Sequence, residues 1–425
     1  MFLTYDTQVV ALLGGSGTRL GSDKSGVPKS MTDVHGKPFF QYQLELMRWH
    51  GFRDFLFLTG FRGDAVRKHF GSGDKFGVRI RYSEDGDMPL GTAGALKKAA
   101  PLLNDDFLLI YGDSYRDADY SELIYYYRQA RLSGKETLLA VYRNMNKYDK
   151  SNILFKDGSL IAYDKAGTAQ GMEHIDYGVS IMHKKVTQEI PGGASDLAGL
   201  YHCLIESARA AGHEVRTRFY EIGTPASLDE FRRFMSARIF AKRKAIFLDR
   251  DGTLNETVMN PQAGEKDSPF RPEDVRLIPH VVDALKIFRS LGYLLVVVTN
   301  QPAAAKAKTT LGDLYAVNNR LRDLLAKEDI MFDDLLMCPH HPVGSPATGE
   351  PYLIRECTCR KPHTGLFLKG IEKFNITAAQ SYAVGDREVD IAAGEAAGIK
   401  GILLGKDYKD LFAFSKYLQK ESELR

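Results

Sequence analysis

Short runs of β-branched and aromatic residues alternate along the chain with longer stretches whose apolar residues recur every three or four positions. The short runs are typical of buried strands, and the longer stretches are typical of amphipathic helices. This alternation predicts βα units with mainly parallel sheets, and therefore an α/β fold. The clearest predicted strands are 8–13, 54–59, 107–111, 137–141, 245–248, 293–299, 381–384 and 401–404, and the clearest helices are 39–50 and 120–132.

The pattern restarts near residue 240, where a short basic stretch precedes a new strand at Ala245. A chain of 425 residues is also longer than one hydrophobic core usually serves. We therefore expect two Rossmann-like domains, residues 1–240 and 241–425. No internal repeat or low-complexity tract changes this division.

The composition, with 44% hydrophobic and 26% charged residues, is that of a globular protein. A formal net charge of +3 gives no reason to expect nucleic acid or a membrane surface as partner. No apolar run reaches the roughly 20 residues that span a bilayer, and the first residues lack a signal-peptide pattern. Three of the four cysteines cluster with histidine, which favours metal binding in a reducing compartment, so we expect a cytoplasmic protein. Cys203 is expected to be a core residue, and homo-oligomerisation is left open.

Two carboxylates follow the first strand of the C-terminal half. Asp249 and Asp251 are two positions apart on extended backbone, so both can face one point at the strand's carboxyl end. One can attack phosphorus, while the other protonates the leaving oxygen and then activates water.

Further polar residues follow the later strands of the same half. Thr299 and Asn300 offer a hydroxyl and an amide to phosphate oxygens, and Lys361 offers a positive charge. Asp386 follows another strand and could complete a magnesium site with Asp249.

The order of these motifs resembles the haloacid dehalogenase superfamily. The resemblance implies a phosphatase in which Asp249 is the nucleophile and Asp251 the acid and base. It also implies phosphate binding by Thr299 and Lys361, and Mg²⁺ held by Asp249, Asp386 and the Asp251 carbonyl.

A cysteine- and histidine-rich loop, residues 338–361, interrupts this half. Three thiolates and one imidazole suit tetrahedral Zn²⁺, and two tight pairs that close a loop indicate a structural site. The expected ligands are Cys338, His340, Cys357 and Cys359, with His341 and His363 as alternatives for the histidine.

The loop ends in Arg360-Lys361-Pro362 and resembles the subgroup of heptose 1,7-bisphosphate and histidinol-phosphate phosphatases. That resemblance implies no large cap over the site and substrate contacts by Asn300 and Arg360. The segment after Asn300 departs from the usual small-residue and arginine pattern, because it contains Lys306 and Lys308 instead. Lysine keeps the charge but lacks the bidentate fork of arginine, so substrate identity is the point in doubt.

In the N-terminal half a glycine-rich turn, Gly14-Gly15-Ser16-Gly17-Thr18, follows the first strand. Its backbone N–H groups can bind phosphate oxygens, although it matches neither a P-loop nor a dinucleotide fingerprint. Arg19 and Lys29 add two cations that can stabilise a transferring phosphoryl group.

With Pro28-Lys29-Ser30-Met31, this turn resembles the sugar-1-phosphate nucleotidyltransferases over residues 7–235. The resemblance implies a mixed sheet flanked by helices and catalysis by Arg19 and Lys29. Glu221 is one methylene longer than the aspartate common at its position. The other roles implied are nucleotide binding by Gly14, Gly15, Ser16, Gly17, Thr18, Gly91 and Thr92, Mg²⁺ binding by Asp113 and Glu221, and sugar binding by Lys165, Asp176 and Gly178.

The two halves together indicate consecutive reactions on one sugar. Our leading hypothesis is removal of the 7-phosphate from D-glycero-D-manno-heptose 1,7-bisphosphate, followed by nucleotidyl transfer to heptose 1-phosphate. The resemblance favours GTP as donor. The alternatives are the same reactions on a mannose or glucose phosphate, a phosphatase regulated by a non-catalytic nucleotide-sugar-binding domain, and histidinol phosphate as the phosphatase substrate.

Overall fold

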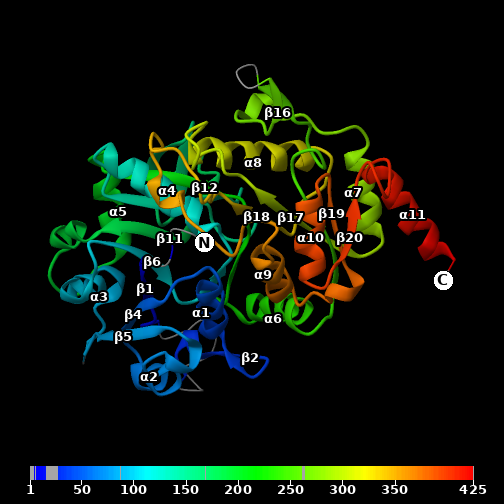
Figure 1. The fold of residues 1–425 in the computed structure, drawn as a ribbon. Coiled ribbons are helices and arrows are strands. Elements are labelled where there is room, and N and C mark those ends of the chain that lie inside the picture. The colour runs from blue at the N-terminus through cyan, green and yellow to red at the C-terminus, as the bar shows by residue number, and fades with distance from the viewer. Residues whose placement is uncertain are drawn as a thin grey trace. The chain divides into compact units, whose positions relative to one another are not determined.

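The computed structural model describes residues 4, 6–15, 27–86, 88–167, 169–260 and 264–424. The chain divides into two compact units, Met1–Met235 and Ser236–Arg425, each with its own sheet and flanking helices (Figure 1). The expected α/β class is confirmed in both units.

The first unit is built on a nine-stranded mixed sheet. Its centre has the order β11-β6-β1-β4-β5, in which β6, β1, β4 and β5 are parallel and β11 is antiparallel. The carboxyl ends of the four parallel strands therefore meet at one edge. The strands are β1 (Gln8–Leu12), β4 (Asp54–Thr59), β5 (Arg79–Glu84), β6 (Asp106–Tyr111), β8 (Thr137–Arg143), β9 (Ile153–Lys156), β10 (Ser159–Tyr163), β11 (His174–His183) and β12 (Ala210–Val215).

Helices cover both faces of this sheet because alternate strand residues point to opposite sides. Leu56 and Leu58 belong to a core shared with α3 and α5, whereas Phe57 packs edge-on against Phe40 of α1 and Phe70 of α2. The helices are α1 (Phe39–Trp49), α2 (Gly63–Phe70), α3 (Gly91–Lys98), α4 (Tyr120–Leu132), α5 (Leu197–Glu206) and α6 (Pro225–Ile239), the last of which crosses the unit boundary. Two short pairs are β2 (Asp33–Val34) with β3 (Lys37–Pro38), and β7 (Ser114–Arg116) with β13 (Phe219–Glu221).

The second unit has a five-stranded parallel sheet of order β18-β17-β14-β19-β20. Its central strands are almost continuously apolar because helices bury both of their faces. The strands are β14 (Lys244–Leu248), β17 (Tyr293–Asn300), β18 (Asp334–Cys338), β19 (Tyr382–Gly385) and β20 (Lys400–Leu403), with a separate hairpin of β15 (Val258–Asn260) and β16 (Glu265–Asp267).

Residues of α7, α8 and α11 share one core with Ile246 and Leu248, on one face of this sheet. Phe247 points to the other face, where it contacts Phe367 of α9. The helices are α7 (Val281–Ser290), α8 (Leu311–Ala326), α9 (Gly365–Phe374), α10 (Glu388–Ala396) and α11 (Leu411–Glu423).

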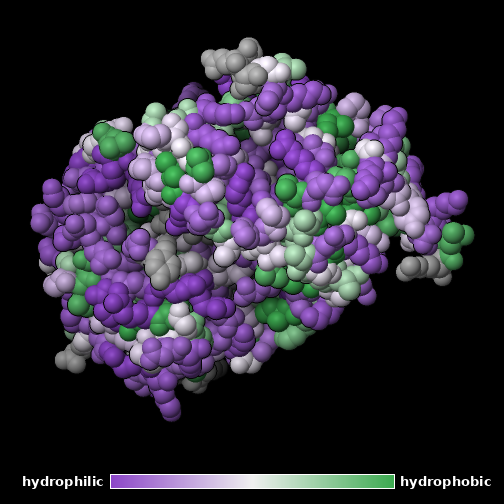
Figure 2. Space-filling model, viewed as in Figure 1, coloured by the Kyte–Doolittle hydropathy of each residue, from purple (hydrophilic) through white to green (hydrophobic). Residues whose placement is uncertain are grey.

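All eight predicted strands and both predicted helices occur, with ends that coincide or differ by at most two residues. The expectation for Cys203 was wrong, because this residue is exposed. The buried stripe of α5 is formed by Leu197, Leu200, Tyr201 and Leu204, and Cys203 lies outside it. Figure 2 shows a largely hydrophilic face with hydrophobic residues in small separate groups. None of the helices in the described part of the chain combines the length and apolar character that crossing a bilayer demands.

Candidate active sites

The parallel strands of the second unit bring its predicted catalytic residues to one edge. Asp249 follows β14, and its N–H donates to the Val384 carbonyl of β19 at 2.9 Å. Lys361 arrives from the loop after β18 and donates to Asp249 Oδ1 at 2.6 Å and to the Val298 carbonyl at 2.7 Å. Its Nζ is also 2.5 Å from Asp390 Oδ1, so one buried ammonium bridges two carboxylates.

Three carboxylates form a group that suits a magnesium ion. Oxygens of Asp249, Asp386 and Asp390 lie within 4.8 Å of one another. Asp386 Oδ1 is buried and has no hydrogen-bond partner among the described residues, as expected of an oxygen reserved for a cation. Gly252 makes room for this group, because it has a φ of +80° and a Cβ there would lie 2.3 Å from Asp386 Oδ2.

The two aspartates of the first motif have different electrostatic surroundings. Burial raises the pKa of Asp249 to about 6, although the Lys361 ammonium acts in the opposite direction. Burial also acts to raise the pKa of Asp251, but the Arg250 guanidinium and several hydrogen bonds outweigh it and hold this pKa below its ordinary value.

Five hydrogen bonds keep Asp251 ionised. Arg250 donates two of them, at 3.1 and 3.0 Å, and its own side chain is fully buried. Asn255, Ser268 and Gln301 donate the others, at 2.9, 2.9 and 2.6 Å. In this arrangement the ionised Asp251 can accept a proton. A protonated Asp251 can no longer accept all five hydrogen bonds, so its carboxyl group has to move away from some of the donors.

The end of β17 supports both Asp251 and Lys361. The Thr299 hydroxyl is buried and accepts a hydrogen bond from Gln301 Nε2 at 2.8 Å. The Asn300 side chain makes two hydrogen bonds to the main chain of Lys361, each at 3.0 Å. Its Nδ2 donates to the Lys361 carbonyl, and its Oδ1 accepts the Lys361 N–H. The visible role of Asn300 is thus to position Lys361, and its contact with substrate stays a prediction.

Positive charge gathers near Arg360. Burial, together with the charges of Arg360 and Lys308, lowers the pKa of Lys306. Lys308 is paired with Asp267 at 2.6 Å. The charges of Arg360 and Lys308 thus act on Lys306, whereas Lys308 itself is paired with a carboxylate.

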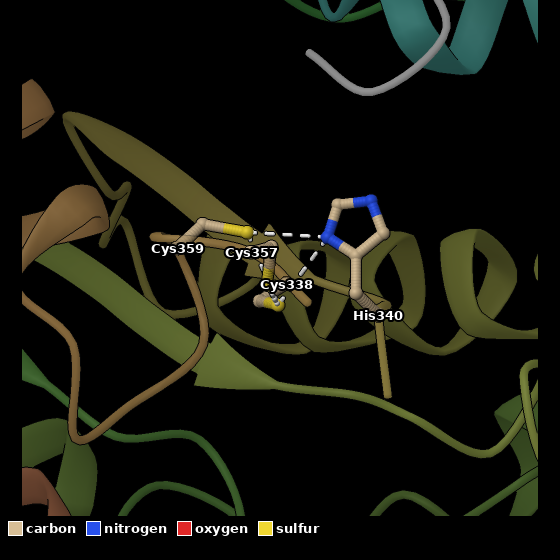
Figure 3. Close-up of side chains that lie close together, drawn as sticks. All are labelled: Cys338, His340, Cys357 and Cys359. Carbon is tan, nitrogen blue, oxygen red and sulfur yellow. Dashed lines mark hydrogen bonds between the residues drawn. The ribbon is translucent and has the colours of Figure 1, made fainter. Parts of the chain in front are cut away.

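The four predicted zinc ligands converge (Figure 3). Cys338 Sγ lies 3.7 Å from His340 Nδ1 and 3.7 Å from Cys357 Sγ, and Cys359 Sγ lies 3.2 Å from both Cys338 Sγ and His340 Nδ1. A tetrahedral zinc with bonds of about 2.3 Å to sulfur separates its sulfur ligands by about 3.8 Å, so the group fits Zn²⁺.

The alternative histidine ligands lie outside this group. His341 Nδ1 lies within hydrogen-bond distance of the Val343 main chain, and neither His341 nor His363 belongs to the four-residue cluster. His340 is therefore the imidazole in position to bind the metal.

A cavity of about 250 Å³ lies at the carboxyl ends of β6, β1 and neighbouring strands of the first unit. Asp113 follows β6, and the pairing of β13 with β7 places Glu221 opposite Ser114, the residue after Asp113. Lys29 Nζ lies 2.6 Å from Asp113 Oδ2 and 3.4 Å from Glu221 Oε1. The structure thus brings together three residues that are up to 192 positions apart in the chain.

Lys29 offsets only part of the negative charge of this triad. Burial acts to raise the pKa of Asp113, but the nearby Lys29 ammonium outweighs it and lowers that pKa. Burial and the Asp113 carboxylate raise the pKa of Glu221. Two carboxylates beside one ammonium suit a divalent cation, which would remove their mutual repulsion.

The predicted nucleotide-binding residues line the same cavity, namely Gly14, Gly15, Gly91 and Thr92. Thr92 Oγ1 accepts the N–H of Leu197 at 2.9 Å, which ties the start of α3 to the start of α5. Ser16, Gly17, Thr18 and Arg19 lie outside the described residues.

The predicted sugar-binding residues lie on β11 and the loop after β10. Asp176 Oδ1 accepts the N–H of Gly178 at 2.8 Å, and burial raises the pKa of Asp176 to about 6. Lys165 Nζ pairs with Asp196 at 2.5 Å. Tyr111 lines the cavity and interacts electrostatically with Asp176 and Asp196, which connects the sugar-binding residues to the cavity.

Sequence reasoning missed several residues of the two sites. Asp390 and Gln301 belong to the second unit, and Asp85 and Arg116 to the first. Asp85 could have been predicted, because it follows a strand of alternating polar and apolar residues. It lies at the edge of the sheet where the other polar residues collect. Arg116 carried no such signal, and it is buried with its Nε donating to the Tyr177 carbonyl at 2.5 Å.

Two family matches agree with these sites. Residues 8–148 match the nucleotidyl transferase family, and residues 358–411 match the HAD-hydrolase-like family. The fold and sites therefore define a bifunctional enzyme, with a nucleotidyltransferase domain followed by a phosphatase domain of the haloacid dehalogenase type.

Curated relatives show more closely which phosphatases the chain is related to. The chain is 38% identical over 155 residues to the D-glycero-β-D-manno-heptose-1,7-bisphosphate 7-phosphatase of Escherichia coli, covering 36% of this chain and 75% of that protein. It is 37% identical over 173 residues to the enzyme of the same name from Haemophilus ducreyi, covering 40% of this chain and 87% of that protein. The chain belongs to the family of these heptose bisphosphate phosphatases.

A solved structure matches the fold of the other part of the chain. A Bacillus anthracis protein described as a glucose-1-phosphate thymidylyltransferase superposes with a TM-score of 0.50 and 18% identity, covering 56% of this chain and 98% of that one. This likeness concerns the fold alone.

Proposed function

We propose that the enzyme hydrolyses the 7-phosphate of D-glycero-D-manno-heptose 1,7-bisphosphate and then transfers a nucleotidyl group, GMP by preference, to the heptose 1-phosphate formed. The observation that carries the proposal is the kinship with heptose bisphosphate 7-phosphatases in a chain that also has a nucleotidyltransferase domain. The product of the first reaction is the class of substrate that the second domain consumes.

In the phosphatase reaction, Asp249 Oδ2 attacks phosphorus and the phosphate–sugar bond breaks, which leaves an aspartyl-phosphate. Asp251, protonated once it has left some of its hydrogen-bond donors, gives this proton to the departing sugar oxygen and later takes one from the water that hydrolyses the intermediate. Lys361 and the Thr299 hydroxyl bind the phosphoryl oxygens. Asp249, Asp386 and the Asp251 carbonyl would hold Mg²⁺, with Asp390 nearby, and the ion would neutralise phosphoryl charge.

The positive charges of Lys306 and Arg360, which act on each other, support a substrate with a second phosphate. An anion bound there relieves the repulsion between these two side chains, so a bisphosphate gains more than a monophosphate. These two charges thus favour the heptose bisphosphate over a singly phosphorylated sugar.

In the transferase reaction, an oxygen of the sugar 1-phosphate attacks the α-phosphorus of the nucleoside triphosphate, and pyrophosphate leaves. Lys29 and Arg19 neutralise the triphosphate, and Lys165 and Asp176 hold the sugar phosphate and sugar hydroxyls. Asp113 and Glu221 would hold Mg²⁺, which would screen the charge of the leaving pyrophosphate.

The test is to incubate the full chain with Mg²⁺, heptose 1,7-bisphosphate and each nucleoside triphosphate, and to identify products by mass spectrometry. We expect inorganic phosphate, pyrophosphate and one nucleotide-heptose, with GTP the best donor. Heptose bisphosphate left intact by a protein that releases phosphate from another sugar bisphosphate would disprove the heptose assignment.

A further inference from the structure

We propose that Asp267 and Ser268 reserve the phosphatase reaction for sugars with a second phosphate, because they hold Asp251 until an anion draws Lys308 away from Asp267. The inference rests on the proposed phosphatase function and adds the residues that select a bisphosphate. Asp267 is the last residue of β16, and Ser268 directly follows it.

The carboxylate of Asp251 has no lone pair left for a proton. It accepts five hydrogen bonds, whereas its two oxygens offer about four lone-pair sites. One donor must therefore leave before Asp251 can take up the proton that it gives to the departing sugar oxygen.

Ser268 is the donor that can leave at the lowest cost. Arg250, Asn255 and Gln301 are fully buried, so they cannot exchange Asp251 for water. Release of Arg250 would also leave a buried guanidinium without its carboxylate. Ser268 is only partly buried, so its hydroxyl can bond to water after it leaves Asp251 Oδ2.

Asp267 connects Ser268 to Lys308. Its Oδ1 accepts the Ser268 N–H at 2.9 Å, and its Oδ2 lies 2.6 Å from Lys308 Nζ. Lys308 Nζ also lies 5.9 Å from the centre of the Phe270 ring. One lysine thus holds residues 267–270 where Ser268 reaches Asp251.

Lys308 itself is fixed at its main chain and accessible at its side chain. Its N–H donates to the carbonyl of the buried Ala303 at 2.9 Å, whereas its side chain is 41% exposed. The charges of Lys308 and Asp267 both act on Lys306, so Asp267 is an internal anion among these lysines. A sugar phosphate carries about 1.5 to 2 negative charges at pH 7, more than one carboxylate, and therefore competes with Asp267 for Lys308.

This competition connects the second phosphate to proton transfer. When Lys308 pairs with the phosphate, Asp267 becomes hydrated, residues 267–268 move and Ser268 leaves Asp251. One lone pair of Oδ2 then takes up a proton from solvent, and Asp251 passes it to the departing sugar oxygen. A sugar whose single phosphate is bound at Asp249 offers no anion to Lys308, so Asp251 stays held.

The experiment measures phosphate release by the full chain in Mg²⁺ from D-glycero-D-manno-heptose 1,7-bisphosphate and from the corresponding heptose 7-phosphate, which differ only in the second phosphate. We expect kcat of the unchanged chain to be about tenfold higher for the bisphosphate, a factor that corresponds to one hydrogen bond. Asp267→Asn and Ser268→Ala should each raise kcat for the 7-phosphate about tenfold and leave kcat for the bisphosphate within about twofold. A purely structural role would lower both values together.

Glu265→Gln is the matched control, because Glu265 lies on the same strand and is exposed. Its kcat should equal that of the unchanged chain for both substrates. Equal kcat for the two substrates in the unchanged chain, or no gain with the 7-phosphate in either variant, would overturn the inference alone. A chain that hydrolyses neither substrate would overturn the proposed phosphatase function, and the inference with it.

Discussion

In both sites, single charged residues change the free energy of unfolding by amounts that can be measured. Lys361 is 2% exposed and holds Asp249 and Asp390, which are themselves buried. Asp176 is a partly buried carboxylate whose pKa is raised to about 6. Replacing these two residues should have opposite effects on stability, because Lys361 offsets buried negative charge whereas Asp176 introduces it.

Lys361→Met should abolish phosphatase activity and lower the unfolding free energy of the second unit by about 3–5 kcal/mol, because it leaves buried carboxylates without their cation. Urea unfolding followed by circular dichroism measures the change. Lys406→Met is the control, since Lys406 forms an exposed pair with Glu388 at 3.6 Å and such pairs contribute little. Equal stability of the two variants would contradict the bridging role of Lys361.

Asp176→Asn should stabilise the first unit at pH 7 while weakening sugar binding. Between the ordinary aspartate pKa of 3.8 and the raised pKa of about 6, the folded state binds more protons at Asp176 than the unfolded state does, so the stability contribution of this residue falls as pH rises through that interval. Asparagine removes this loss, which is about 3 kcal/mol at pH 7 because each unit between the two pKa values contributes about 1.4 kcal/mol.

Trp49 is the single tryptophan and lies in α1, so its fluorescence follows unfolding of the first unit. Stability of Asp176→Asn should exceed that of the unchanged protein at pH 7 and approach it at pH 4. A variant less stable at pH 7 would show that the ionised carboxylate contributes more through its hydrogen bonds than it loses by burial.

At the scale of elements, the loop 338–361 is long and has little regular structure. Its only helical turn in the described residues is Pro351–Leu353, and its main cross-link is the cluster of Cys338, His340, Cys357 and Cys359. Because Lys361 and Arg360 end this loop, order in the loop determines where two site residues lie.

Removal of zinc by a chelator, with Mg²⁺ kept in excess, should therefore abolish phosphatase activity and lower the melting temperature of the second unit. Nucleotidyl transfer and the Trp49 fluorescence should not change. Cys359→Ser should reproduce the loss, whereas Cys203→Ser should have no effect because Cys203 is exposed and outside the cluster. Full phosphatase activity in protein shown by mass spectrometry to contain no zinc would disprove the role of the metal.

At the scale of the whole molecule, the chain contains two units with separate cores. Each candidate site consists of residues from one unit. Asp249→Asn should therefore stop phosphate release and leave transfer to supplied sugar 1-phosphate unchanged, and Lys29→Met should do the reverse. The two rates are measured separately, as phosphate and as pyrophosphate. Loss of both activities in either variant would reveal an energetic dependence of one site on the other.

The sequence by itself determined the α/β class, the strands and much of the chemistry of both sites. This was possible because parallel strands end at one edge of their sheet, so a polar residue just after an apolar run already has a predictable place. Asp249, Asp386 and Asp113 were assigned to strand ends in this way, and the structure places them there. The cluster of Cys338, His340, Cys357 and Cys359 was predicted because three cysteines and a histidine fall in two tight pairs.

Only the tertiary structure decided how residues from distant segments combine. The pairing of β13 with β7 sets Glu221 beside Asp113, and Asn300 holds the backbone of Lys361 across 61 positions of sequence. Asp85 becomes part of the cavity because β5 joins the same parallel sheet. Such contacts depend on strand order and loop closure. The local pattern of polar and apolar residues fixes neither of these, because it records which face of an element is buried and not which element covers it.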